Sequence, residues 1–286
     1  MKPLAQDTPL QVEKIWIAGL RDRGPLWRLR RLVGMTSFCW QAAYDAFRRV
    51  QPAATSMARE AWLLRERYGN DVAHRVIELS QSRGLYRETS MSTNRELWDA
   101  LLPVVEALET LGMSYYVGGS VASSVTGVAR ATLDVDLVAA LHVEQAEPLA
   151  AALMQHYYVD VEMMQHAVRR CSSFNVIHLA SMFKVDVFVP EDTPFARANM
   201  HRRVALEVPE VGRTLYFCAP EDIVLHKLLW YKAGSGVSDR QWYDLQGVLR
   251  LQAQGLDLSY LQQWAAELGV TALLHRALEE AGLSGA

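Results

Sequence analysis

The stretch GGSVASSVTGVARATLDVDLV, residues 118–138, decides the fold class. It follows residues 114–117, whose composition is typical of a short strand, and its first three residues are Gly118, Gly119 and Ser120. Glycines let the backbone approach a ligand closely, and a helix that begins after Ser120 presents unpaired N–H groups and the positive end of its dipole. A strand, two glycines, a serine and a helix together are typical of a phosphate-binding turn.

Two aspartates lie near the end of the same stretch, in a run that alternates apolar and polar residues. On a strand, Asp134 and Asp136 point to one face, while Leu133, Val135 and Leu137 point to the other. Two neighbouring carboxylates repel each other unless a cation lies between them, and Mg²⁺ is a usual solution. A solvent-facing edge strand with two aspartates is the plainer interpretation of this pair when it is taken alone.

A third carboxylate follows about fifty residues later, in Lys184-Val185-Asp186-Val187. Asp186 is flanked by valines on what we expect to be another strand, so a polar role must keep it there. The glycine turn, the aspartate pair and this third aspartate together occur in the order, and on the elements, of one known catalytic constellation.

These residues resemble the polymerase-β-like nucleotidyltransferase superfamily, which has a Gly-Gly/Ser turn, Asp-x-Asp on the next strand and a third Asp later. Residues 118–137, with Arg130 and Thr132 ahead of the aspartate pair, look like the bacterial AbiEii-type and MenT-type nucleotidyltransferases. Many of those proteins are toxins of toxin–antitoxin systems. The resemblance implies an α+β fold with a polymerase-β-like core, namely a mixed sheet with flanking helices, and helical N-terminal and C-terminal regions.

The resemblance extends over residues 95–250. Lys227, in a helix that begins with Pro220-Glu221-Asp222, matches the helical lysine of those relatives that contacts triphosphate. Asp244 stands at the position of the aspartate in their later helix. Where the relatives have a Lys/Arg-Asp pair ahead of this aspartate, the chain has Arg240-Gln241, so the match is weaker there.

The resemblance implies a distinct role for each of these residues. Asp134 and Asp136 would bind two Mg²⁺ or Mn²⁺ ions, and Asp186 would bind the one nearer the acceptor. Gly119 and Ser120 would hold the β and γ phosphates of an NTP, with help from Lys227. The other nucleotide-binding residues would be Gly118, Arg130 and Asp244. The acceptor would be the 3′ end of an RNA such as a tRNA, or a protein hydroxyl, and a toxin would have a cognate antitoxin as a partner.

Each of the outer residues also has a plainer interpretation. Lys227 is solvated or ion-paired on its helix, Asp244 pairs with Lys227 or Arg240, and Arg130 orders the loop before the aspartate strand. The alternative function, from another class, is a catalytically inactive nucleotide-binding protein with a regulatory or interaction role. Because Ser120 has no nearby histidine in the sequence, a hydrolase nucleophile is not expected.

The periodicity along the chain predicts three regions. Residues 1–92 are expected to be a helical N-terminal region, residues 93–218 the catalytic core, and residues 219–286 a helical C-terminal region. Within the core, strands are expected over 133–140, 158–162, 174–179 and 184–189, with a helix over 143–156. Arginines gather early in the N-terminal region, where they either solvate helix faces or offer a surface to a polyanion: Arg21, Arg23, Arg28, Arg30 and Arg31.

Composition sets the expected location. The net charge of −3 and the pI of about 6.3 give no general attraction to nucleic acid. Three scattered cysteines fit neither a disulfide framework nor a zinc cluster, which favours a reducing compartment. The sequence has neither a secretion signal nor a long apolar run, so we expect a cytoplasmic protein without a membrane partner.

Overall fold

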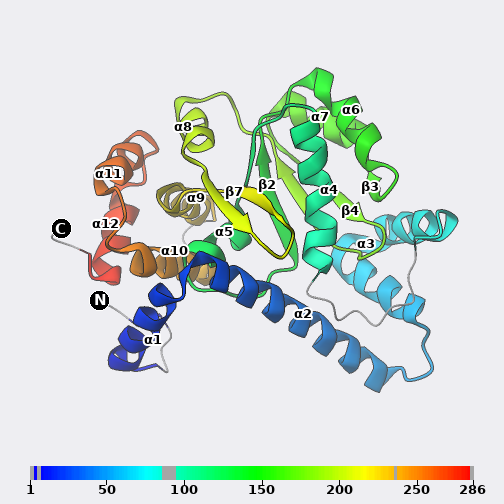
Figure 1. The fold of residues 1–286 in the computed structure, drawn as a ribbon, viewed down its shortest axis with the longest axis horizontal. Coiled ribbons are helices and arrows are strands. Elements are labelled where there is room, and N and C mark those ends of the chain that lie inside the picture. The colour runs from blue at the N-terminus through cyan, green and yellow to red at the C-terminus, as the bar shows by residue number, and fades with distance from the viewer. Residues whose placement is uncertain (1–2, 5–7, 86–94, 235–236, 284–286) are drawn as a thin grey trace. The chain divides into compact units, whose positions relative to one another are not determined.

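The computed structural model describes residues 3–4, 8–85, 95–234 and 237–283. The chain divides into two compact units that are discontinuous in sequence (Figure 1). Unit 1 comprises residues 1–32, 116–130 and 192–286, and unit 2 comprises residues 33–115 and 131–191. Each compact unit draws on segments that are far apart in the sequence.

The strands of unit 2 belong to a mixed sheet, in which their order is β3-β4-β5-β2. These strands are β2 (Asp134–Ala139), β3 (Tyr157–Val159), β4 (Ser173–His178) and β5 (Lys184–Phe188). β2 and β5 are parallel, and β4 runs antiparallel to both of its neighbours. The central strands are apolar on one face, where Val135, Leu137, Val185 and Val187 are fully buried.

Helices complete unit 2. They are α3 (Ser56–Ser82), α4 (Glu96–Thr110), α6 (Val143–Leu153), α7 (Val161–Arg170) and the part of α2 (Gly24–Val50) that follows residue 32. α4 packs on β2, β4 and β5 with a fully buried stripe that includes Leu101, Val104 and Leu108. That spacing of three and four residues is the reason for its helical form, since it gathers the apolar side chains on one face.

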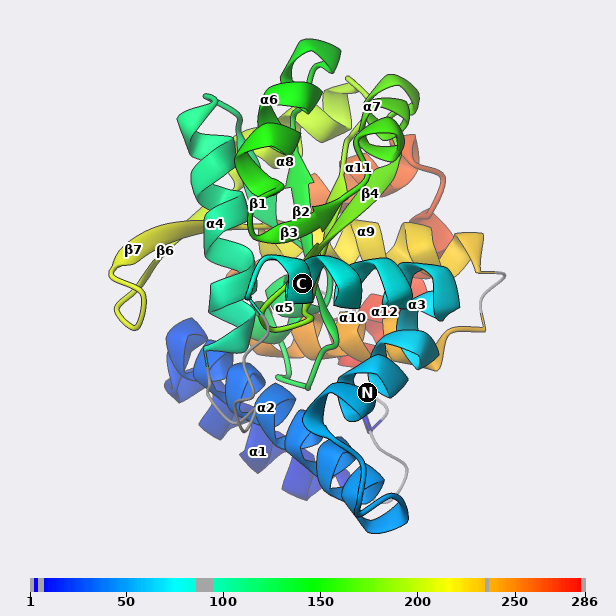
Figure 2. The same ribbon diagram turned by 90° about the vertical axis from the view of Figure 1, so that its right-hand side faces the viewer.

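The strands of unit 1 have the order β1-β7-β6. β1 (Tyr115–Val117) is parallel to β7 (Arg213–Phe217), which forms an antiparallel hairpin with β6 (Val204–Val208), drawn in yellow in Figure 2. The other elements of unit 1 are helices: α1 (Leu10–Asp22), the first turns of α2, α5 (Gly119–Thr126), α8 (Pro194–Arg202), α9 (Pro220–Ala233), α10 (Asp239–Gln252), α11 (Leu258–Glu267) and α12 (Thr271–Ala281).

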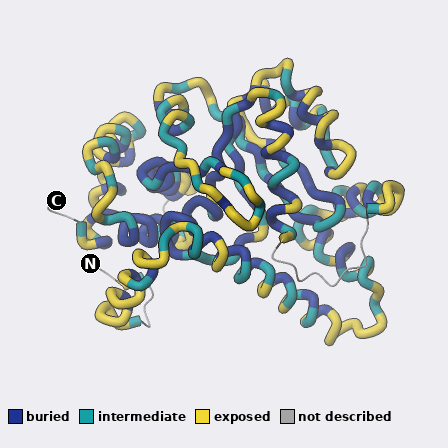
Figure 3. The backbone as a smooth tube through the Cα atoms, in the orientation of Figure 1, coloured by how far each residue is buried: buried dark blue, intermediate teal, exposed yellow. Residues whose placement is uncertain are grey.

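Burial follows the elements in both units. Buried positions run along the strands and the inward faces of the helices, and exposed positions mark the turns and the outward faces (Figure 3). Among the described residues, no helix is long and apolar enough to cross a membrane.

The predicted fold class is confirmed: the chain is α+β, with mixed strand pairing, flanking helices, and helices at both ends. One predicted strand is wrong in part. The strand expected over residues 158–162 ends at Val159, because Asp160 begins α7 by accepting a hydrogen bond from the Met163 backbone N–H at 2.9 Å. α8 was not expected from the sequence, and it begins in the same way at Thr193, whose hydroxyl accepts from the Ala196 N–H.

Candidate functional site

Three predicted carboxylates and one lysine form a grid on one face of the sheet in unit 2. In the register of the parallel strands β2 and β5, Asp134 lies opposite Lys184 and Asp136 lies opposite Asp186. All four are half-buried, and the residues between them on each strand are fully buried on the other face. The two-residue period of a strand thus places three carboxylates together, as the sequence predicted.

The Lys184 ammonium offsets part of this negative charge. Its Nζ lies 2.5 Å from Oδ2 of Asp186 and 3.8 Å from Oδ2 of Asp134. Burial raises the pKa of Asp186 above its ordinary value, and the charge of Asp134 raises it further, whereas Lys184 opposes both effects. No role for Lys184 is predicted from the sequence. Its two-residue separation from Asp186 places both side chains on one face of β5.

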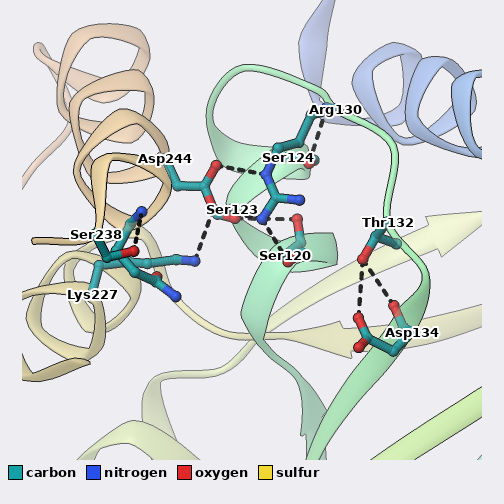
Figure 4. A network of polar contacts seen from close by, with 10 residues as sticks. Ser120, Ser123, Ser124, Arg130, Thr132, Asp134, Lys227, Ser238 and Asp244 are labelled. Carbon is teal, nitrogen blue, oxygen red and sulfur yellow. Dashed lines mark hydrogen bonds and ion pairs between the residues drawn. The ribbon is translucent and has the colours of Figure 1, made fainter. Parts of the chain in front are cut away.

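Hydrogen bonds from Thr132 hold the beginning of β2. The Thr132 hydroxyl donates to the backbone oxygen of Asp134 at 3.1 Å or to its Oδ1 at 3.2 Å, contacts that Figure 4 draws. The Thr132 N–H in turn donates to the hydroxyl of Thr36, on α2, at 3.1 Å. Both threonines are buried, so the hydrogen bonds that orient the Asp134 carboxylate come from buried positions.

The donor set suits a divalent metal in kind. The three carboxylates supply the hard oxygen ligands that Mg²⁺ and Mn²⁺ prefer, and a cation already contacts two of them in the form of Lys184. As the described side chains stand, no three His, Cys, Asp or Glu residues converge on one point where an ion could be held. A metal at this grid therefore requires the Lys184 ammonium to move aside.

The turn that is predicted to bind phosphate lies in unit 1, between β1 and α5. Val117 ends β1, Gly118 precedes the helix, and α5 begins at Gly119. Gly119 has a φ of 49°, in the left-handed region that favours glycine, so the sharp turn into the helix depends on this residue type. Ser120 follows in the first turn of α5 and is half-buried.

Arg130 joins this turn to α10 (Figure 4). Its Nη2 donates to the hydroxyl of Ser120 at 2.7 Å, and its Nε and Nη2 each donate to one carboxylate oxygen of Asp244 at 2.8 Å. Lys227, on α9, donates from Nζ to Oδ2 of Asp244 at 2.9 Å. The side chains of Asp244 and Lys227 are 2% and 7% exposed, whereas Arg130 is 17% exposed, so Arg130 is the cation that a ligand can reach most readily.

The Asp244 carboxylate remains charged in this setting. Burial raises its pKa, but the hydrogen bond from Arg130 and the charges of Lys227 and Arg130 together outweigh burial and leave the pKa below its ordinary value. One carboxylate therefore organises two cations, and the group keeps a net positive charge beside Ser120.

Two glycines bring α10 close enough for this contact. A Cβ at Gly127, just after α5, would lie 2.9 Å from the backbone nitrogen of Val248, and one at Gly247 would lie 3.2 Å from Cγ2 of Val128. Because both positions lack a side chain, the two helices approach at van der Waals distance. The hydroxyl of Ser238 fixes the start of α10 by accepting from the Gln241 N–H at 3.4 Å.

The structure thus gathers the predicted residues into two groups. Ser120, Arg130, Lys227 and Asp244 form one polar network in unit 1, beside Gly118 and Gly119, and Asp134, Asp136 and Asp186 share one face in unit 2. Of the two pairings considered for Asp244, the one with Lys227 is present; Arg240 is exposed, and Arg130 is the second partner.

Comparisons with known proteins give few matches. No family model matches the chain, and no curated protein matches it. Among solved structures, the chain is similar to the crystal structure of an antigenic nucleotidyltransferase-like protein from Paracoccidioides brasiliensis. The two sequences are 17% identical, the match covers 64% of this chain and 93% of that chain, and the TM-score is 0.36. Support for a function must therefore come from the residues of the two groups themselves.

Proposed function

We propose that the protein is a metal-dependent nucleotidyltransferase, which moves an NMP group from an NTP to a hydroxyl acceptor and releases pyrophosphate. The observation that carries this proposal is the grid on β2 and β5, where Asp134, Asp136 and Asp186 share one face of adjacent strands. Like charges gathered in a half-buried place are costly, and they are retained where a cationic ligand uses them.

The network in unit 1 supports the donor half of the proposal. Ser120 and Arg130 present a hydroxyl and a guanidinium that suit phosphate oxygens, and Asp244 and Lys227 hold Arg130 in place. Chain connectivity ties this network to the carboxylates, because Arg130 and Asp134 are only four residues apart.

The three carboxylates would hold Mg²⁺ or Mn²⁺. When bound, these ions make the attacking hydroxyl a better nucleophile and neutralise the charge of the departing pyrophosphate. Lys184 has a flexible stem and a single-point charge, so its ammonium can leave Asp186 without a change in the strand. Asp186 accepts the hydrogen bond of the acceptor hydroxyl and orients it, while Ser120 and Arg130 donate to the β and γ phosphates.

The acceptor is proposed as an RNA 3′ end, such as that of a tRNA, or a protein hydroxyl. A role as the toxin of a toxin–antitoxin pair, with a cognate antitoxin that binds the protein, follows from the AbiEii-type and MenT-type resemblance of residues 118–137. A nucleotide-binding protein without turnover is the second candidate, and it is favoured by one observation: Lys184 already neutralises part of the carboxylate grid.

Labelling of cell extract distinguishes these candidates. The purified full-length chain is incubated with each of the four NTPs labelled at the α-phosphate, with Mg²⁺ or Mn²⁺, and with extract. Digestion of the product with nuclease or protease then identifies the acceptor. We expect label in one macromolecular class, and loss of at least about 100-fold in rate for Asp136→Asn.

The control is Asp192→Asn, at a surface aspartate whose side chain is 84% exposed and pairs with Arg197. This variant should label as the wild type does. Absence of label with every NTP and both metals would contradict the proposal, and NTP binding without turnover would establish the second candidate. Labelling by Asp136→Asn at more than a few per cent of the wild-type rate would show that the carboxylate assignment is wrong.

A further inference from the structure

Arg67 brings a cation from the N-terminal helices to the carboxylate grid of unit 2. It lies on α3, and its Nη2 donates to the backbone oxygen of Leu133, the residue before Asp134. The centre of its guanidinium lies 4.5 Å from the centroid of the Trp40 ring and 5.2 Å from that of Tyr68. A hydrogen bond to β2 and contact with two aromatic rings fix the position of this guanidinium.

The charges of two grid carboxylates act on the fixed guanidinium. Burial, the largest influence, lowers the pKa of Arg67 below its ordinary value, while the negative charges of Asp134 and Asp186 act in the opposite direction. Among the described residues, Arg67 makes no ion pair within 4.0 Å, and its one hydrogen bond uses one of five N–H donors. Donors therefore remain for a ligand beside the grid.

The local backbone fits this role. Gly69 has φ 80° and ψ 170° within α3, so the first arm of the helix ends directly after Arg67 and Tyr68. Irregular backbone of this kind is costly and is retained where it aims side chains. A guanidinium that is already held in place loses little entropy when it donates to a phosphate, which is the condition for effective stabilisation of developing charge.

We propose that Arg67 is a catalytic residue that donates to a nonbridging oxygen of the α-phosphate of the donor nucleotide. This inference rests on the proposed nucleotidyl transfer. In that step, a bond forms between the acceptor oxygen and the α-phosphorus as the bond to the bridging oxygen of pyrophosphate breaks. The hydroxyl proton passes to a carboxylate oxygen of Asp186 and then to water. Arg67 neutralises charge on the α-phosphate.

Three full-length variants test this inference. Arg67→Met removes the cation, and Arg67→Lys keeps a charge but loses the planar fork and its contact with the rings. Arg59→Met is the matched control, since Arg59 is also on α3 and lies 5.3 Å from the centroid of the Tyr44 ring. Within the described part of the chain, its one hydrogen bond goes to Ser56 in its own helix. For each variant, the melting temperature, the NTP titration, kcat and KM are measured.

We expect kcat to fall about 100-fold to 1,000-fold in Arg67→Met and nearly as far in Arg67→Lys, with KM for NTP within about threefold of wild type. A second readout uses NTPs in which sulfur replaces one nonbridging α-phosphate oxygen. The wild type should slow markedly with one of the two diastereomers, and Arg67→Met should lose most of that difference because the sensitive contact is gone.

Several results would overturn the inference. Among them are an equal loss of kcat in Arg59→Met, a rise in KM with kcat retained, and an undiminished sulfur effect in Arg67→Met. A fall in the melting temperature that accounts for the lost activity would make Arg67 structural. A wild-type protein that consumes no NTP would instead contradict the proposed function, which keeps the two failures distinguishable.

Discussion

At the scale of single residues, Asp244 has the clearest energetic role. Its carboxylate accepts from Arg130 and Lys227 in a setting where Asp244 and Lys227 are nearly buried. Replacing it by asparagine leaves Lys227 without its counter-ion in a place of low polarity. Removing one partner of a buried ion pair typically costs about 3–5 kcal/mol, and the partial exposure of Arg130 places our expectation for Asp244→Asn near about 3 kcal/mol.

The pH dependence of that cost follows from the pKa of Asp244, which is lowered in the folded protein. Because this pKa is lowered, the Asp244 carboxylate stabilises the folded protein at any pH above its unfolded-state pKa of about 3.9. This stabilisation is lost as the pH falls through the folded-state pKa. The gap in unfolding free energy between wild type and Asp244→Asn should therefore be constant near neutral pH and shrink in acid. Urea unfolding at several pH values measures it.

A control on the same helix checks that the effect belongs to the ion pair. Asp239, in the first turn of α10, is exposed, so Asp239→Asn should change the stability by less than about 1 kcal/mol at every pH. A gap for Asp244→Asn that stays constant below about pH 3 would contradict the assignment of the pH dependence to this carboxylate.

Single residues also show what sequence reasoning reaches. Asp134 and Asp136 could be placed on one face because the strand period is two, and Asp186 because valines flank it. Arg67 could not be predicted, since its helix comes from a distant segment and nothing in its own neighbourhood marks it. The partnership of Arg130 with Asp244 spans 114 residues and depends on helix packing that periodicity does not encode.

At the scale of elements, the predictions succeed where an apolar pattern extends over many residues. They fail where a capping side chain determines where a short helix begins. α4 and β2 follow from their buried stripes. α7 and α8 are short and are begun by Asp160 and Thr193, whose side chains each satisfy a backbone N–H. Both signals are present in the sequence, but a strand-like run just before α7 masks the first of them.

The turn at Gly69 makes a prediction for α3. Its φ of 80° and ψ of 170° lie in a region that residues with a Cβ rarely occupy, although a Cβ there would meet no atom within 4 Å. Gly69→Ala should therefore destabilise the protein by about 1–3 kcal/mol through backbone strain alone. Because Arg67 and Tyr68 precede the turn, the variant should also lower kcat of the full-length enzyme.

Gly34→Ala is the matched control. Gly34 lies inside α2 with ordinary helical backbone and no atom within 4 Å of an added Cβ, so alanine should raise the stability by up to about 1 kcal/mol. Thermal unfolding of both variants gives the comparison. If Gly69→Ala were as stable as wild type, α3 would have to be a continuous helix in solution, and the placement of Arg67 would need revision.

At the scale of the whole molecule, side chains between residues 13 and 30 pack into unit 1. Arg28 is buried and donates to the backbone oxygens of Val125 and Leu20 at 2.6 and 2.9 Å. Glu13 forms a buried ion pair with Arg250 of α10. Arg21 donates to the backbone oxygen of Arg250, and Arg30 pairs with Glu210. The early arginines are thus largely occupied in packing, which the sequence could not show because their partners lie far along the chain.

Because of this packing, we expect a chain that begins near residue 90 not to fold cooperatively. Truncation removes Glu13 and leaves the Arg250 guanidinium, 2% exposed in the intact protein, without its counter-ion; this loss alone costs about 3–5 kcal/mol. It also removes Ile17, Leu20 and Leu29 from the buried surface of unit 1. Those losses together match the typical total stability of a domain, about 5–15 kcal/mol. Circular dichroism during heating should therefore show no cooperative transition for the truncated chain, whereas Glu13→Gln in the full-length chain should still unfold cooperatively at a lower temperature. A truncated chain that melts cooperatively and binds NTP would contradict this prediction. Residues 1–90 would then be a separate unit, and their early arginines would be available to a polyanion.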